Sequence, residues 1–134
     1  MCLHKIDPKV KNHIKKEKGY GIGWKIFIEV NKRREFEVFT HCKKIPLEKW
    51  IPEKSFRSPM AKHFNYIDGD GLRYKKGFHF YLSQEDAIIS GINPLGSGKR
   101  VVRKIWFKKP VAFGYQNMKE VGVAKEIYIQ RNKK

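Results

Sequence analysis

Hydrophobic and polar residues alternate with period two in several stretches of this chain, a pattern typical of strands with one buried face. The stretch 20–30 places apolar side chains on one face, namely Trp24, Ile26, Ile28 and Val30. Residues 36–40 alternate in the same way, with Phe36, Val38 and Thr40 on one face, and a polar segment separates the two runs. This pattern predicts an antiparallel hairpin.

The second half of the chain predicts a strand, a short helix and two more strands. Residues 72–82 read as extended, and Phe78 and Phe80 alternate there with His79 and Tyr81. Ser83 precedes Asp86 by three residues, a spacing that predicts a helix start, and the helix should end at Gly91. Extended runs follow at 101–113 and 121–130, and a proline at position 110 is expected to end regular pairing.

This order of elements predicts an α+β fold: a single domain with a curved, mainly antiparallel sheet and a few short helices. Residues 1–18 are expected to form a basic N-terminal arm or short helix, residues 19–130 the globular domain, and residues 131–134 a basic tail. Prolines interrupt residues 43–67, which should hold only short helical turns and loops.

The chain carries a large positive charge that is concentrated at its two ends. Its 30 Lys and Arg against 13 Asp and Glu give a formal net charge of +17. Residues 1–34 contribute +7, residues 35–95 contribute +1 and residues 96–134 contribute +9. If the ends are neighbours in the fold, as termini often are, they create one positive field. Such a field favours an anionic partner, namely nucleic acid, a phosphorylated nucleotide or an acidic host protein; a Lys-rich solvated surface is the alternative.

Several site classes are disfavoured by motif context. The glycines at 19–23 precede a strand, whereas a dinucleotide-binding turn follows one, and NPLGSGKR lacks the first Gly and the Ser or Thr of a P-loop. Cys2 and Cys42 are too few for a disulfide scaffold and lack the spacing of a zinc site, so we expect no metal. No apolar stretch predicts a leader or a membrane span, and the chain reads as cytoplasmic.

Candidate ligand contacts are basic residues for the phosphates and aromatic residues for the bases. Two aromatic residues, Trp24 and Tyr81, are candidates for stacking on a base. Adjacent strand residues such as Arg103 and Lys104 must point to opposite sides, so not all basic residues can meet one ligand. The anion-binding candidates are Lys32, Arg33, Arg34, Lys99, Arg100, Arg103, Lys108 and Lys109.

The motif GFHFYLSQEDA at 77–87, followed by a basic strand and VAKEIYI at 123–129, resembles small phage and mobile-element proteins that have a Gly-Phe-His strand. The opening MCLHK and the early GWKIF are similar to theirs as well. This resemblance implies a binding protein that inhibits a host process such as a defence system.

More remotely, the order of elements resembles the ADP-ribosyltransferase fold, which implies a half barrel and an alternative function. Under that resemblance the protein would be a NAD-dependent transferase in which Lys25 lies at the NAD-binding position, His79 lies on the central strand and Glu126 is the catalytic carboxylate. The chain departs from the pattern, because Ala124 stands where arginine-modifying enzymes have Glu or Gln and the serine-threonine-serine signature is absent. A non-catalytic binder that needs no cofactor is therefore the main prediction.

Overall fold

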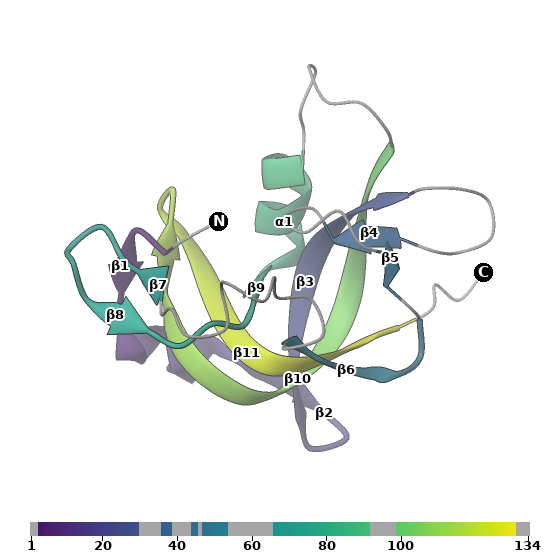
Figure 1. Ribbon diagram of the computed structural model, residues 1–134, viewed down its shortest axis with the longest axis horizontal. Helices are drawn as coiled ribbons and strands as arrows, with labels where there is room; N and C mark the ends of the chain where they lie inside the picture. Colours follow the sequence, from purple (N-terminus) through teal and green to yellow (C-terminus); the bar gives the residue numbers. More distant parts are fainter. Residues whose placement is uncertain are drawn as a thin grey trace.

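A computed structural model describes residues 3–29, 36–38, 44–45, 47–53, 66–91 and 99–130. Most of these residues lie in antiparallel strands, with one short 3-10 helix, η1, and one short α-helix (Figure 1). In chain order the elements are β1 (Lys5–Ile6), η1 (Pro8–His13), β2 (Lys15–Glu17), β3 (Tyr20–Glu29), β4 (Phe36–Val38), β5 (Lys44–Ile45), β6 (Trp50–Pro52), β7 (Tyr66–Ile67), β8 (Arg73–Tyr74), β9 (Phe78–Tyr81), α1 (Gln84–Gly91), β10 (Lys99–Gln116) and β11 (Lys119–Ile129).

The main sheet curves until it closes on itself. Strand β3 pairs with β10, β10 with β11, β11 with β9, and β9 returns to β3 through the pair Trp24 and Tyr81. All of these pairings are antiparallel. The predicted single α+β domain with a curved, mainly antiparallel sheet is confirmed, as is the hairpin formed by β3 and β4.

Strands β10 and β11 form one long bent hairpin that supports the rest of the sheet (Figure 1). Their turn has positive φ at Asn117 (50°) and Met118 (65°), the combination of a type I′ turn. The prediction that Pro110 ends regular pairing is confirmed in part, because a bulge follows between Pro110 and Ala112, but β10 then stays paired with β11 to Gln116. Among the described residues, β10 has a partner on only one side at Pro110, so a proline there interrupts the hydrogen bonds of at most one ladder.

The interior of the closed sheet is filled with aromatic and branched side chains. Phe27, Phe80, Ile105 and Ile127 are all fully buried there, and the Phe80 and Phe107 rings stack with centroids 4.3 Å apart. The glycines of β3 make this possible, because a Cβ at Gly21 or Gly23 would overlap the Phe107 or Phe80 ring. The narrow interior therefore depends on the absence of side chains at alternate positions of β3.

A second apolar cluster lies on the other face of the sheet, where α1 packs against β3, β9 and β10 (Figure 1). It contains Tyr81, Ala87 and Val121. The predicted helix start is confirmed, because the Ser83 hydroxyl accepts a hydrogen bond from the Asp86 N–H at 3.4 Å.

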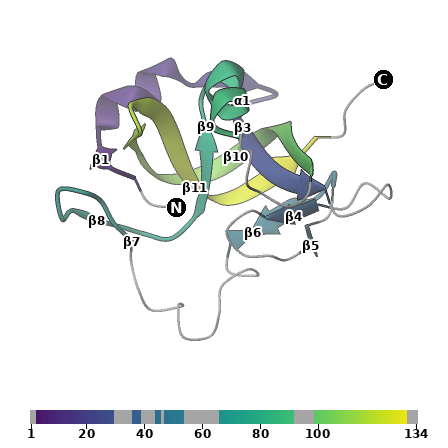
Figure 2. The same ribbon diagram turned by 90° about the horizontal axis from the view of Figure 1, so that it is seen from above.

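The N-terminal segment is integrated into the sheet. The predicted short helix is present as η1, whose N-cap Asp7 accepts from the Lys9 N–H. In addition, β1 pairs with β10 and β2 pairs with β3, and Leu3 and Val10 are both buried. Figure 2 shows β1 on one side of the molecule and β4 and β5 on the other. The two positively charged ends of the sequence are thus hydrogen-bonded neighbours, while the predicted tail 131–134 lies outside the described residues.

Candidate functional site

Four aromatic side chains form a continuous cluster on the outside of the closed sheet, which we call the aromatic face: Tyr20, Trp50, Trp106 and Tyr128. Trp106 stacks on Tyr128 with centroids 5.0 Å apart, and Tyr20 contacts both Trp50 (4.8 Å) and Trp106 (5.8 Å). The fourth contact, between Trp50 and Tyr128 at 5.7 Å, completes a ring of four contacts. All four side chains are partly exposed.

Strand register explains why the cluster forms. Tyr128 of β11 lies opposite Trp106 of β10 on one side and Trp50 of β6 on the other. Directly opposed residues on neighbouring strands have their side chains on the same face and within contact distance. The neighbouring positions Ile105 and Ile127 point into the interior, so the alternation of β10 and β11 directs the aromatic residues outward.

Lysine side chains surround the aromatic face. The Lys108 ammonium lies over the Trp50 ring at 4.2 Å and the Lys18 ammonium over the Trp106 ring at 5.1 Å. An ammonium over an indole is a cation–π contact, worth about 0.5–1 kcal/mol at an exposed site. Aromatic rings bordered by cations are the arrangement that binds bases by stacking and phosphates by charge.

We call Lys18, Lys104, Lys108 and Lys109 the lysine border of the aromatic face, and two carboxylates partly neutralise it. Glu126 pairs with Lys109 at 2.6 Å and with Lys108 at 3.7 Å, and the Lys109 hydrogen bond lowers the pKa of Glu126 below its ordinary value. Glu17 accepts from Lys104 at 2.6 Å, which likewise lowers the pKa of Glu17. Both carboxylates are therefore charged at neutral pH and reduce the net positive charge beside the aromatic face.

The predicted anion-binding residues lie in different parts of the structure. Lys108 and Lys109 meet at Glu126 beside the aromatic face. Arg103 lies opposite Lys25 on the side of β10 that carries Ile105, whereas Lys104 is on the other side, so the expected divergence is confirmed. Arg100 is partly exposed near the start of β10. The basic turn Lys32, Arg33 and Arg34 and the side chain of Lys99 lie outside what the structure describes.

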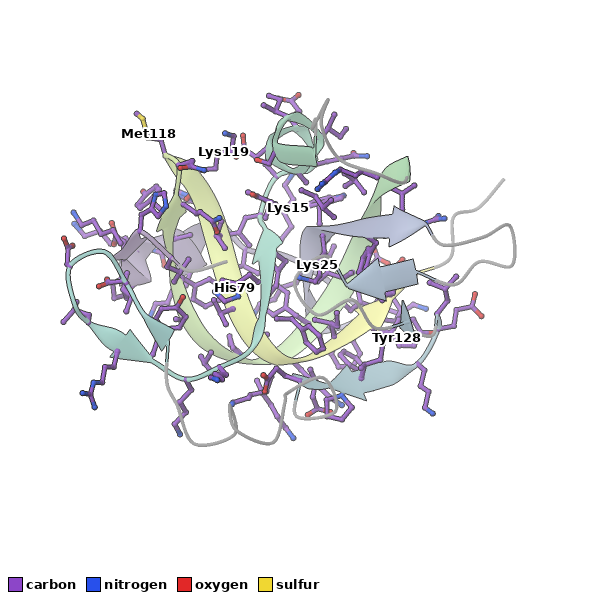
Figure 3. The ribbon with its side chains drawn as sticks, turned by 45° about the horizontal axis from the view of Figure 1, so that its top comes forward. Lys15, Lys25, His79, Met118, Lys119 and Tyr128 are labelled. Carbon is purple, nitrogen blue, oxygen red and sulfur yellow. The ribbon has the colours of Figure 1, made fainter. Side chains whose placement is uncertain are left out.

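The three residues named for catalysis do not converge. Lys25 is buried in the interior, where its ammonium donates to the His79 carbonyl at 2.8 Å and desolvation lowers its pKa to about 8. The His79 side chain is on the other face of β9, with Nε2 3.1 Å from the Tyr74 hydroxyl. Glu126 lies outside with its lysines, and its neighbour Ile127 points inward. Figure 3 places Lys25 and His79 near the middle of the molecule and Tyr128 toward its edge.

The predicted stacking residues are less accessible than the aromatic face. Tyr81 is only 5% exposed and packs in the cluster beneath α1, so the prediction that it stacks on a base is not supported by its position. Trp24 is partly buried against the same cluster.

Sequence reasoning missed Tyr20, Trp50, Trp106 and Tyr128 as a group. A signal was present in β10, where Lys104, Trp106 and Lys108 alternate with the inward residues Ile105 and Phe107. Reading the polar side of that strand as a binding surface would have identified Trp106. Trp50 gave no such signal, because it lies in the proline-interrupted segment 43–67. The expectation of only short helical turns and loops there is wrong, because Lys44–Ile45, Trp50–Pro52 and Tyr66–Ile67 pair as strands.

Other site classes find no support among the described residues. Within these ranges, no three His, Cys, Asp or Glu side chains gather closely enough to hold a metal ion. No helix of the described part is long and apolar enough to cross a membrane. Comparisons with protein-family models, curated proteins and solved structures find no match to this chain.

Proposed function

We propose that this protein is a small basic binding protein that engages single-stranded nucleic acid through the aromatic face. The observation that carries the proposal is the ring of contacts among Tyr20, Trp50, Trp106 and Tyr128, partly exposed and with lysine ammonium groups over both indoles. Stacking supplies affinity for any base, and the lysines supply affinity for the phosphates. Such a surface binds without a strong sequence preference.

Single-stranded nucleic acid fits this surface better than a duplex does. The faces of paired bases are hidden within the helical stack, whereas unpaired bases can be splayed out onto aromatic side chains. The net charge of +17 adds a long-range attraction for any polyanion. The charge sets how strongly polyanions are attracted, while the rings favour single strands among them.

The transferase alternative gains no support from the geometry, because Lys25 and Glu126 lie on opposite faces of the sheet and Glu126 is paired with Lys109. The ADP-ribosyltransferase-like half barrel stays a prediction about the fold. A phage origin and the inhibition of a host defence process rest on resemblance alone and also stay predictions. An acidic host protein as the partner would be recognised by copurification of one defined protein in place of nucleic acid.

The test is a fluorescence titration of the purified protein with a single-stranded oligonucleotide, a matched duplex and a mononucleotide over a series of salt concentrations. Stacking on Trp50 or Trp106 should quench tryptophan emission. The logarithm of the association constant should fall by about 0.7 per contacted phosphate for each decade of salt. A duplex that binds as tightly as the single strand would contradict the stacking surface.

Matched aromatic variants separate stacking from charge. Trp50→Leu removes one ring of the aromatic face and should weaken single-strand binding by about 5- to 150-fold, since each stacked base contributes about 1–3 kcal/mol. Tyr115→Leu is the control, because Tyr115 is a partly exposed aromatic on β10 near the hairpin turn, away from the aromatic face. Equal affinities of the two variants would refute the proposal.

A further inference from the structure

A groove of about 620 Å³ lies outside the aromatic face, between the N-terminal segment and the β7–β8 hairpin. Ile6 and Pro8 form one wall, Tyr74 lies in the opposite wall, and residues 110–113 of β10 form the floor. Its volume is within the range of about 300–1,000 Å³ that is typical of small-molecule sites. The groove is lined largely by apolar atoms, as such sites commonly are.

The two walls are held together by specific hydrogen bonds. The Asp68 carboxylate accepts from the Ile6 N–H at 3.0 Å, and the Gly69 N–H donates to the His4 carbonyl at 2.9 Å. Asp68 also accepts from the N–H groups of Asp70 and Leu72. Burial raises the pKa of Asp68, but these hydrogen bonds outweigh it and lower the pKa overall. The β7–β8 hairpin is therefore fixed against β1, and the groove is built into the fold.

Three cations border the groove: Lys11, Arg73 and Lys75. All three side chains are exposed, and none forms an ion pair with another residue that the structure describes. No Asp or Glu is among the residues that line the groove. This differs from the aromatic face, where Glu17 and Glu126 neutralise part of the lysine border.

Strand β10 connects the two surfaces. Trp106 and Lys108 belong to the aromatic face and its border, Lys109 pairs with Glu126, and the next residue, Pro110, begins the floor of the groove. Trp106 and Ala112 are six residue steps apart, which at about 3.3 Å each span at most about 20 Å. That length corresponds to about six stacked nucleotides at about 3.4 Å each.

We propose that the groove is a second subsite for the same single strand, in which Lys11, Arg73 and Lys75 hold the backbone phosphates of nucleotides that continue past the aromatic face along β10. The inference rests on the proposed function, because it extends the path of that ligand. The aromatic face then determines whether a single strand binds. The groove determines whether a longer strand binds more tightly than a short one. A short oligonucleotide reaches the first surface alone, while a longer one occupies both.

The test compares oligonucleotides of about 4 and about 12 nucleotides, lengths within the site sizes known for small single-strand-binding domains. The groove variant is Lys11→Gln with Arg73→Gln, and the control is Lys5→Gln with Lys119→Gln, which removes the same charge near the hairpin turn. For the longer oligonucleotide, the groove variant should reduce the salt slope by about 1.4, which is 0.7 for each lost phosphate contact. For the shorter one, the two variants should bind equally.

The outcomes separate the two proposals. If the wild-type protein binds neither oligonucleotide, the proposed function fails. If it binds both but the groove variant and the control are equally affected, the aromatic face stands and the groove inference is overturned. A groove variant that weakens mononucleotide binding but leaves the longer oligonucleotide unaffected would instead indicate an independent nucleotide site and would also overturn it. Thermal unfolding of each variant checks that the exposed substitutions leave the fold intact.

Discussion

Replacing Glu126 by Gln tests the binding function and the transferase alternative in one experiment, because the two predict opposite results. Glu126 holds Lys109 at 2.6 Å and Lys108 at 3.7 Å, and the Lys109 hydrogen bond lowers its pKa, so the carboxylate is charged at neutral pH. The substitution keeps the size of the side chain and removes its charge. Both ammonium groups then become available to phosphates beside the aromatic face.

The expected magnitude follows from counterion release. Each additional phosphate contact steepens the slope of the logarithm of the association constant against the logarithm of salt by about 0.7. Over the decade from about 1 M to about 0.1 M salt, one contact therefore adds about five-fold to the affinity. One released lysine therefore predicts about a five-fold tighter complex, and two predict about 25-fold at most. The loss of a partly exposed ion pair should cost about 1 kcal/mol or less in unfolding free energy.

The assay is a salt series of oligonucleotide titrations on the wild-type protein and the Glu126→Gln variant, with NAD turnover measured in parallel. Glu120→Gln is the control, since Glu120 contacts His13 and no lysine of the aromatic face. The transferase alternative requires the Glu126 carboxylate and predicts loss of nicotinamide release with no gain in binding. An affinity and a salt slope that do not change in Glu126→Gln would refute the electrostatic reasoning.

Three stability predictions follow from the interior and the hairpin. The pKa of Lys25 is lowered from 10.5 to about 8 by burial, so the unfolded chain binds more protons between these values and stability rises with pH there by about 3 kcal/mol. Lys25→Met should remove this rise. Urea unfolding of the wild-type protein and the variant at pH 7 and pH 10.5 would show a smaller gain in unfolding free energy for the variant. Gly23→Ala places a methyl group against the Phe80 ring and should destabilise by about 1–3 kcal/mol in the same assay; an unchanged midpoint would contradict the tight interior. Met118→Gly relieves a positive φ in the hairpin turn and should raise the unfolding free energy by up to about 1 kcal/mol, a gain that thermal unfolding would show as a higher midpoint.

The sheet could be predicted from the sequence wherever alternation was long and uninterrupted. The hairpin of β3 and β4, the face shared by Phe78 and Phe80, and the helix start at Ser83 all came from local patterns. Short elements gave no such pattern, because a two-residue strand such as β1 is specified by its partner and not by its own periodicity. The continuation of β10 past Pro110 also depended on something outside the local sequence, namely that a single neighbouring strand is present there.

The site was harder to predict than the fold, because it combines distant parts of the chain. Tyr20, Trp50, Trp106 and Tyr128 come from four different strands, and their contacts depend on the register between β6, β10 and β11. Charge alone identified Lys108 and Lys109 but could not show that Glu126 neutralises them. Alternation showed that Tyr81 and His79 share a face, yet it could not reveal that α1 and the N-terminal segment cover that face.

The closed sheet also explains why charge and aromatic residues meet at one place. The two positively charged segments of the sequence are brought together because β3, from the first, pairs with β10, from the last. Tyr20 and Lys18 come from the first segment and Trp106, Tyr128 and Lys108 from the last, so the aromatic face lies where the two segments join. Trp50 of the middle segment is added through the pairing of β6 with β11. A polyanion drawn in by the summed field therefore arrives at the rings that can stack on its bases, and long-range attraction and short-range recognition act on the same ligand.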